Sequence, residues 1–94
     1  MIVGVCEIEL HLPVATSLKD KRSVLKSLLA RLHNTFNVSA AEVDKQDLWQ
    51  SAVIGVAVVS NSSVHVQQQL NNILDWIETN FPNVYITRQK VEMR

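Results

Sequence analysis

Two acidic residues and a histidine alternate with apolar residues near the start of the chain. Glu7, Glu9 and His11 are two positions apart, so on a β-strand their side chains point to one face at intervals of about 6.6 to 6.8 Å. Carboxylate and imidazole groups in such a row can bind a shared divalent metal ion. The alternative is ion pairing across strands, because Arg88 and Lys90 alternate in the same way near the end of the chain. We expect this pairing, and we expect no metal ion or other cofactor.

The positive charge is concentrated in one segment. Residues 17–36 contain five basic residues and one acidic residue, whereas residues 46–87 contain no Lys or Arg. Within the basic segment Lys19, Arg22 and Lys26 are three and four positions apart, a spacing that places them on one exposed stripe of a helix. Cations in the first turn of a helix oppose the macrodipole, and a bound anion would offset that cost.

RNA phosphate is the anion that such a stripe suggests, since contacts from Lys and Arg to phosphate dominate the affinity of nucleic-acid binding. The alternative is a solvated helix face that binds no ligand. The candidate nucleic-acid-binding residues are Lys19, Lys21, Arg22 and Lys26.

The sequence offers no arrangement typical of an enzyme. Cys6 is the single cysteine, so it cannot form an intramolecular disulfide or a thiolate zinc site, and among apolar neighbours we expect it to be buried and inert. A lone thiol fits a reducing cytoplasm. The two glycines, Gly4 and Gly55, are isolated from each other, which excludes a glycine-rich phosphate loop. We therefore expect a cytoplasmic protein that is not an enzyme.

Length and composition limit the classes of protein. The chain has 94 residues, of which 47% are hydrophobic and 19% charged, and its net charge is zero; these values are typical of one globular domain and not of a disordered chain. A neutral chain has no global field that attracts nucleic acid or an anionic membrane, so any such binding must be local. No segment approaches the roughly 20 apolar residues of a membrane span. The apolar start of the chain leads directly into Glu7 and lacks the basic residues of a signal peptide.

A helix is expected over residues 18–37. Ser17 stands three residues before Asp20, the spacing of a capping box, and this marks the helix start. A left-handed residue at Asn34 or Asn37 is expected to end the helix. The apolar stripe that faces the sheet consists of Leu25, Leu28, Leu29, Leu32 and Phe36.

The other elements follow from alternation and from turn residues. Residues 52–59 are apolar at odd and even positions alike, as in a central strand that is covered on both faces. A second apolar helical stripe precedes Pro82. Strands are expected over residues 2–12, 38–43, 52–59 and 84–93, and the second helix between a cap at residues 61–63 and Pro82.

The order of these elements is βαββαβ, without a repeat or a linker. Short connections and right-handed crossovers favour a four-stranded antiparallel sheet in the order 4-1-3-2, with both helices on one face. The predicted fold class is therefore α+β with a ferredoxin-like architecture, formed by a single domain over residues 1–94. This architecture has many unrelated functions, so it indicates none of them by itself.

Two functions known for this topology conflict with the sequence. RNA-recognition domains stack bases on aromatic residues of the central strands, but the expected open face has two carboxylates there and no aromatic residue. Acylphosphatases need an arginine in a phosphate-binding loop after the first strand, whereas residues 13–16 (Pro-Val-Ala-Thr) contain neither Gly nor Arg. Neither function is expected.

Several blocks of the sequence resemble one bacterial family over nearly the whole chain. They are residues 17–22 (SLKDKR), residues 36–44 (FNVSAAEVD), the pair Trp49 and Gln50, and residues 55–60 (GVAVVS). In order and spacing these blocks are similar to the YlxP-like family, small bacterial domains of unknown function. The family motifs fall here on Lys19, Lys21, Arg22, Asn37, Glu42, Asp44, Trp49 and Gln50.

This resemblance implies a ferredoxin-like fold. It also implies a frequent gene neighbourhood among transcription-elongation, translation-initiation and ribosome-maturation factors, which suggests a role with RNA or the ribosome. It implies no catalytic residues, since none is established for the family.

The sheet face away from the helices is a candidate interface between two copies of the chain. Its central residues are apolar and small; monomers rarely expose such a patch, and small residues allow a second sheet to approach closely. A two-fold dimer would bury the same patch on both copies, unless Arg88 and Lys90 fold over it within one chain. The candidate interface residues are Val3, Val5, Val53, Gly55, Ala57 and Val59. For Trp49 and Trp76 we expect a core or boundary position; the alternative is that they are anchors of an interface.

Together these features predict a cytoplasmic, cofactor-free binding module that contacts RNA or a ribosomal partner through its first helix. The alternative is a protein-interaction domain, a homodimer formed through the sheet, with no role in nucleic-acid binding. No contact with a membrane is expected.

Overall fold

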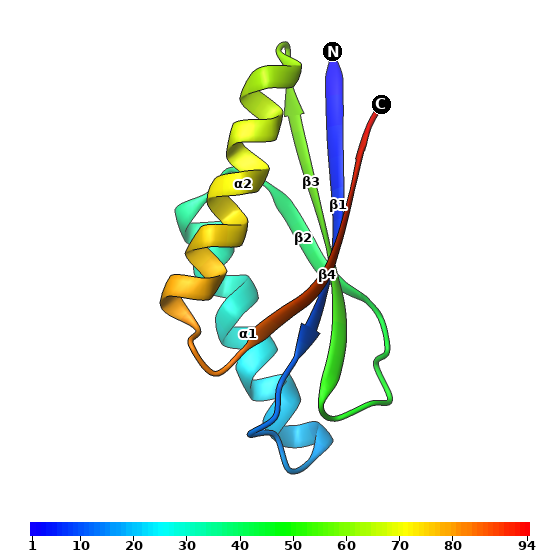
Figure 1. Cartoon of the computed structure of the whole chain (residues 1–94), viewed down its shortest axis with the longest axis vertical. Coiled ribbons are helices and arrows are strands. Elements are labelled where there is room, and N and C mark those ends of the chain that lie inside the picture. Colours follow the sequence, from blue (N-terminus) through cyan, green and yellow to red (C-terminus); the bar gives the residue numbers. More distant parts are fainter.

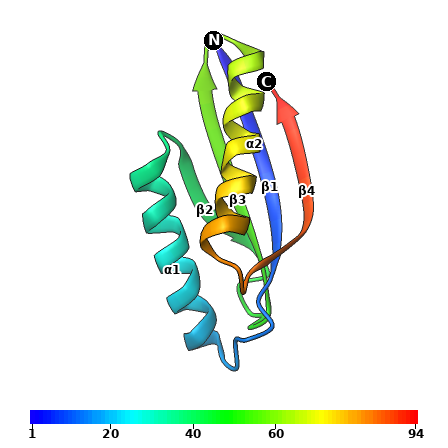
Figure 2. The ribbon, with the colours of Figure 1, turned by 60° about the vertical axis from the view of Figure 1, so that its left-hand side comes forward.

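The computed structural model describes all 94 residues. Its elements are β1 (Ile2–His11), α1 (Leu18–Thr35), β2 (Ser39–Asp44), β3 (Ser51–Ser60), α2 (Ser63–Asn80) and β4 (Tyr85–Met93). The strands form one antiparallel sheet in the order β2-β3-β1-β4 (Figure 1). Both helices pack on the same face of this sheet (Figure 2). The predicted ferredoxin-like α+β fold and its strand order are thus confirmed.

Serine caps begin both helices. Ser17 Oγ accepts a hydrogen bond from the backbone N–H of Asp20 at 3.1 Å, and Ser62 Oγ accepts one from the backbone N–H of His65 at 3.3 Å. Each contact satisfies one of the N–H groups that lack a partner within the helix. The start of α1 was therefore correctly predicted from its capping-box spacing.

The end of α1 differs from the prediction. Its C-cap, Phe36, has extended backbone angles (φ −124°, ψ 144°), so the chain leads from the helix straight toward β2 without a left-handed residue. The prediction of a left-handed Asn34 or Asn37 was wrong. A left-handed backbone occurs instead at Lys45, with φ 60°, in the loop between β2 and β3.

The core lies between the sheet and the helices. In β1 and β3 every second side chain is buried on the helix face, and the stripes of α1 and α2 cover them. Each Val, Leu or Ile side chain of this layer contributes about 1.5 to 3 kcal/mol by leaving water. The strand residues of this layer are Cys6, Ile8, Leu10, Ala52, Ile54, Val56 and Val58, and the helix residues are Leu25, Leu28, Leu32, Val66, Leu70, Ile73 and Ile77.

The opposite face of the sheet has no helix or strand packed on it (Figures 1 and 2). The expectation that both faces of residues 52–59 are covered is therefore wrong for a single chain. Val43 of β2 covers Gly55 locally, because its Cγ1 lies 3.0 Å from the position of a Cβ added to Gly55. The predicted interface residues lie on this open face: Val3, Val5, Val53, Gly55 and Ala57 are half-buried, and Val59 is 63% exposed.

Neither helix combines the length and the apolarity needed to cross a membrane.

Candidate functional site

Three of the four predicted nucleic-acid-binding residues are exposed on α1. Lys19, Arg22 and Lys26 lie at the helix surface, and none of them takes part in an ion pair. Their spacing places them on one stripe, which we call the basic stripe. An unpaired row of cations leaves a local positive field on a chain whose net charge is zero.

The acidic residue inside this segment is already engaged. Asp20 Oδ2 accepts hydrogen bonds from the backbone N–H and the hydroxyl group of Thr16. The hydroxyl bond first, and the N–H bond second, hold the pKa of the Asp20 carboxyl below its usual value. The carboxylate thus closes the loop before α1 and leaves the basic stripe unpaired.

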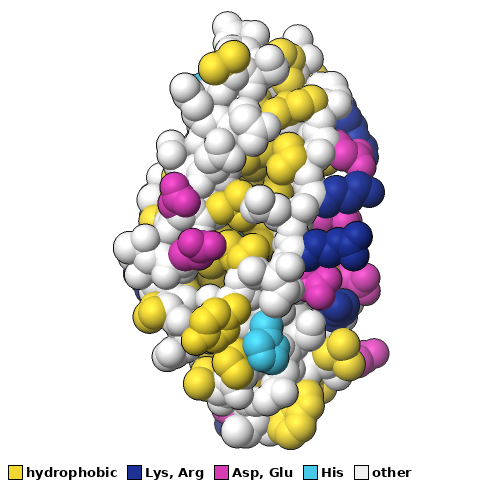
Figure 3. Space-filling model, in the orientation of Figure 1, with side chains coloured by type: hydrophobic (Ala, Val, Ile, Leu, Met, Phe, Trp, Pro, Cys, Tyr) yellow, Lys and Arg dark blue, Asp and Glu magenta, His cyan; other side chains and the backbone are white.

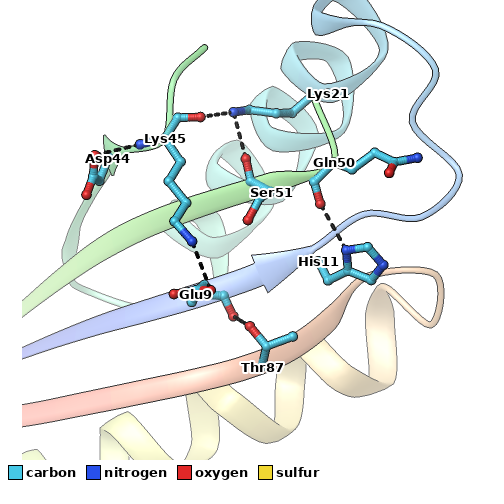
Figure 4. A network of polar contacts seen from close by, with 8 residues as sticks. All are labelled: Glu9, His11, Lys21, Asp44, Lys45, Gln50, Ser51 and Thr87. Carbon is cyan, nitrogen blue, oxygen red and sulfur yellow. Dashed lines mark hydrogen bonds and ion pairs between the residues drawn. The ribbon is translucent and has the colours of Figure 1, made fainter. Parts of the chain in front are cut away.

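Lys21, the fourth candidate, does not belong to the surface. Its side chain has an exposed fraction of 0%, so it cannot contact RNA, and its prediction as a nucleic-acid-binding residue was wrong. Its ammonium group donates to three backbone carbonyl oxygens of the loop between β2 and β3 (Figure 4 draws two of them). These acceptors are the carbonyls of Lys45 at 2.7 Å, Leu48 at 2.5 Å and Ser51 at 2.9 Å.

The three carbonyls use all three N–H bonds of the Lys21 ammonium. Glu42 Oε2 lies 2.9 Å from the same nitrogen, yet this buried oxygen accepts no hydrogen bond. The contact is therefore an ion pair without a hydrogen bond, in which the carboxylate balances a charge that is fully removed from water. Burial of an unpaired ammonium would cost several kcal/mol, so Glu42 and the loop carbonyls fix one another through Lys21.

A signal for this position was present in the sequence. The buried residues of α1 are Lys21, Leu25, Leu28 and Leu32, which continue one helical stripe at spacings of four, three and four. Extending the leucine stripe backwards by one turn places Lys21 on the core side, and away from Lys19 and Arg22.

The ion pairs on the open face differ from those predicted. The register places Glu7 opposite Lys90 and Glu9 opposite Arg88, as expected, but Glu9 Oε1 instead pairs with Lys45 Nζ at 3.0 Å (Figure 4). The left-handed backbone of Lys45 turns its side chain toward β1 while its carbonyl oxygen faces Lys21. The predicted pairing across strands with β4 was therefore wrong for Glu9, and also for Glu7, since Lys90 pairs with Glu92 instead.

Gln50 joins the same loop to the segment before α1. Its side-chain amide donates to the backbone carbonyls of Pro13 at 3.3 Å and Ala15 at 3.2 Å. The backbone carbonyl of Gln50 accepts a hydrogen bond from the backbone N–H of Leu12. The ring nitrogen Nδ1 of His11 lies 3.1 Å from this carbonyl oxygen (Figure 4). Two loops at one end of the molecule are thereby fastened together.

The two tryptophans have different environments. Trp76 of α2 is half-buried and makes edge-on contacts with Phe36 and Phe81, at centroid distances of 5.9 and 5.8 Å; the prediction of a boundary position is confirmed for it. Trp49 is 49% exposed beside Leu48, which is 50% exposed. The same prediction was wrong for Trp49. The backbone carbonyls of its loop contact the buried Lys21, whereas its side chain is left exposed.

The open face of the sheet carries charges of both signs around its apolar centre. In Figure 3 they gather along the edge away from the helices. Glu92 pairs with Arg94 at 3.0 Å and with Lys90 at 3.5 Å, and its hydrogen bonds with them, Arg94 first, hold the pKa of its carboxyl below the usual value. A shallow depression of about 400 Å³ lies over Val5, Ala57 and their neighbours.

The remaining chemical groups form no second site. Cys6 is buried, and this burial raises the pKa of its thiol, which reduces its reactivity. No three His, Cys, Asp or Glu side chains converge as a group that could hold a metal ion.

Similarity to known proteins decides the family. The model of a family described as "Protein of unknown function (DUF503)" matches residues 3–91. The chain belongs to the DUF503 family. It is also 41% identical to "Uncharacterized protein YlxP" of Bacillus subtilis (strain 168) over 91 residues, which cover 97% of this chain and 98% of that protein. The resemblance to the YlxP-like family is thus confirmed.

A solved structure supports the fold of this DUF503 domain. "De novo designed protein Foldit4" matches with a TM-score of 0.54 and 14% sequence identity, over 98% of this chain and 96% of that chain. At this identity the match concerns the fold alone. Membership of DUF503 assigns no activity, so the function must be argued from the residues.

Proposed function

We propose that this protein is a non-catalytic binding module of the cytoplasm that contacts RNA, free or within the ribosome, through the basic stripe. The observation that carries the proposal is that Lys19, Arg22 and Lys26 are exposed on one helix face without a single ionic partner. Most other cations are engaged: Lys21, Lys45, Lys90 and Arg94 form ion pairs, and Arg31 packs against Trp76 and Phe81.

The chemistry of the stripe favours a chain of phosphates over a single small anion. Residues at i, i+3 and i+7 are separated along the helix axis by about 1.5 Å per residue, so the three cations extend over about 10 Å. Successive phosphates of a nucleic-acid strand can follow such a row, and each contact releases counterions. The gene neighbourhood that the YlxP-like family implies supports ribosomal RNA as the source of these phosphates.

Replacement of Lys19, Arg22 and Lys26 by Ala tests this function. We expect the triple variant to lose affinity for ribosomal RNA, and the slope of log affinity against log salt to fall by about 0.7 to 0.9 for each phosphate contact that is lost. The free energy of unfolding should change by no more than about 0.5 kcal/mol per substitution, because exposed unpaired charges contribute little.

The matched control replaces Arg88, Lys90 and Arg94 by Ala. These three cations lie on the open sheet face or at its edge, so the control removes the same net charge from another surface. It should bind RNA nearly as the wild type does. Equal weakening in both variants would mean that only net charge matters, and equal binding by the wild type and the stripe variant would refute the proposal.

The open sheet face supports a second candidate function, assembly into a homodimer. It presents Val3, Val5, Val53 and Ala57 half-exposed and Val59 largely exposed, a contiguous patch of a kind that monomers rarely leave in water. The carboxylates around it have cations beside or opposite them on the same face, so two copies would meet without net repulsion. An isologous contact would bury the patch on both copies.

Val53→Glu tests the dimer, because a contact through this face would bury the two added carboxylates. We expect a dimeric mass for the wild type by light scattering and a monomeric mass for this variant. The control is Val64→Glu, at an exposed valine of α2 outside the face, which should leave the mass unchanged. A monomeric wild type would exclude the dimer.

A further inference from the structure

Three large apolar side chains are exposed at the end of the molecule where α1 begins. Val14 is 60% exposed, Leu48 is 50% exposed and Trp49 is 49% exposed. The hydrogen bonds of Gln50 to the carbonyls of Pro13 and Ala15, on either side of Val14, place the two loops side by side. We call Val14, Leu48 and Trp49 the apolar tip.

The loop that carries Trp49 is held in one conformation. The Lys21 ammonium binds the carbonyls of Lys45, Leu48 and Ser51, so the backbone of the loop is turned inward on both sides of Trp49. The Leu48 N–H also donates to the Lys45 carbonyl at 3.1 Å. A side chain presented by a fixed backbone loses less conformational entropy on binding than one on a mobile loop.

The apolar tip lies at the same end of the molecule as the first turn of α1, which carries Lys19 and Arg22. Lys21 Nζ donates to the Leu48 carbonyl; Arg22 follows Lys21 in the chain, and Trp49 follows Leu48. The side chain of Lys21 therefore links the helix turn that carries Arg22 to the loop that carries Trp49. Unpaired cations and an exposed aromatic ring at one end of a molecule are the two parts of a single-strand binding surface, in which phosphates follow the charges and bases stack on the ring.

We propose that Trp49 stacks on an unpaired base of an RNA strand whose phosphates lie on the basic stripe, so that the site selects single-stranded over duplex RNA. This inference rests on the proposed function. In a duplex every internal base is already stacked on both sides, whereas bases in loops, bulges and ends can turn outward onto an aromatic ring. Leu48 and Val14 extend the apolar surface beside the ring.

The acidic residues of the loop set the path of the strand. Asp44 and Asp47 would repel phosphates, and Lys45 does not offset both because it is paired with Glu9. The phosphates must therefore stay on the side of α1, and only a base, which is uncharged, reaches the tip. The ring and the cations would therefore contact different parts of the strand, and each contact can be removed by mutation without the other.

Fluorescence of Trp49 gives a direct test. Trp76 is the other tryptophan of the chain, so the Trp76→Phe variant has Trp49 as its single indole reporter. We expect a short single-stranded RNA of mixed sequence to quench this emission on binding. An abasic strand of equal length, which keeps the phosphates but has no bases, should bind more weakly and leave the emission unchanged. An RNA duplex should also bind more weakly and leave the emission unchanged.

Affinity measurements on variants of Trp49 provide the second arm. Trp49→Ala should weaken single-strand binding by about 5- to 150-fold, the effect of losing one stacked base, and should leave duplex and abasic binding unchanged. Trp49→Tyr, which keeps an aromatic face, should retain most of the affinity. Trp49→Leu, which is apolar but cannot stack, should behave like Trp49→Ala.

The outcomes separate this inference from the function on which it rests. Single-strand binding that depends on Lys19, Arg22 and Lys26 but not on Trp49, with no quenching, overturns base stacking and leaves the proposed function intact. Absence of binding to every RNA probe refutes both. Loss of a nuclease-resistant protein complex in Trp49→Ala, without any effect on RNA affinity, would assign the tip to a protein partner and overturn the inference.

Discussion

The carboxylate of Glu42, whose side chain is 21% exposed, lies 2.9 Å from the fully buried ammonium of Lys21. Glu42 comes from an edge strand and Lys21 from the first turn of α1, so the pair fixes the helix start against β2. Because the ammonium also binds three carbonyls of the following loop, the same charge determines how the loop presents its side chains. A residue that is unavailable to a ligand thus positions the surface on which we base both proposals.

Lys21→Met should be strongly destabilising. Methionine fills a similar volume but leaves Glu42 without its counter-charge and removes one donor from each of three carbonyls, of which that of Lys45 keeps the Leu48 N–H. Breaking a buried ion pair by removing one partner costs about 3 to 5 kcal/mol, a large share of the roughly 5 to 15 kcal/mol by which domains are stable. Urea unfolding measures the loss.

Two further variants control this prediction. Lys19→Met, two positions away and exposed, should change the free energy of unfolding by no more than about 0.5 kcal/mol. Glu42→Gln should cost less than Lys21→Met, because the ammonium keeps its three carbonyl acceptors. Similar stabilities for Lys21→Met and Lys19→Met would show that the buried contacts contribute little.

Much of the fold could be predicted from the sequence because its patterns are local. The alternation in β1 and β3 and the stripes of both helices depend on the periodicities of strand and helix alone. The path of the chain at the end of α1 is different: two asparagines are compatible with a left-handed cap, but the direct entry into β2 makes Phe36 extended. Tertiary context decided that position.

The candidate site was predicted less well, and again for a physical reason. A lysine within a row of charged residues is typical of a solvent-exposed turn, and the burial of Lys21 depends on three carbonyls of a distant loop and on the carboxylate of Glu42. Similarly, strand order predicts that Arg88 and Lys90 together pair with Glu7 and Glu9. The left-handed backbone of Lys45, which brings a competing cation to Glu9, leaves no pattern in the sequence.

The ion pair of Glu9 with Lys45 can be separated from its cross-strand alternative. In a double-mutant cycle with Glu9→Gln and Lys45→Gln, we expect a favourable coupling of about 0.2 to 1 kcal/mol, which is typical of partly exposed pairs. The cycle of Glu9→Gln with Arg88→Gln should give a coupling near zero, although these residues are register partners. Both coupling energies are measured by urea unfolding, and a larger coupling of Glu9 to Arg88 than to Lys45 would contradict the structure.

The contact of Asp20 with Thr16 predicts a specific dependence on pH. Since the pKa of this carboxyl is lower in the folded protein than its usual value, its contribution to stability is complete above the unfolded pKa of about 3.9 and is lost as the pH falls through the folded pKa. The Asp20→Asn variant should therefore melt below the wild type at neutral pH, and the two melting temperatures should converge in acid.

Asp75→Asn is the matched control for this pH dependence. Asp75 is an exposed carboxylate of the other helix, and its side chain is not held by a hydrogen bond such as the one from Thr16. Its melting temperature should follow that of the wild type at every pH. A difference between Asp20→Asn and the wild type that persists unchanged in acid would mean that the contact does not depend on the charge of Asp20.

The two glycines should respond oppositely to alanine, because they face different surroundings. A Cβ at Gly4 would overlap Cγ1 of Val66, a fully buried residue of α2, so Gly4→Ala should cost about 1 to 3 kcal/mol through overpacking. A Cβ at Gly55 would approach Cγ1 of Val43 at 3.0 Å. Val43 is 48% exposed and can move aside, and alanine also lowers the entropy of the unfolded chain.

We therefore expect Gly55→Ala to be neutral or slightly stabilising in urea unfolding. Val66→Ala in the Gly4→Ala background provides a further check, since removal of Cγ1 relieves the overlap and the two substitutions should cost less together than the sum of their separate effects. Gly4 is then a glycine because α2 approaches β1 too closely for a side chain. Equal effects of alanine at both glycines would contradict this close approach of helix and strand.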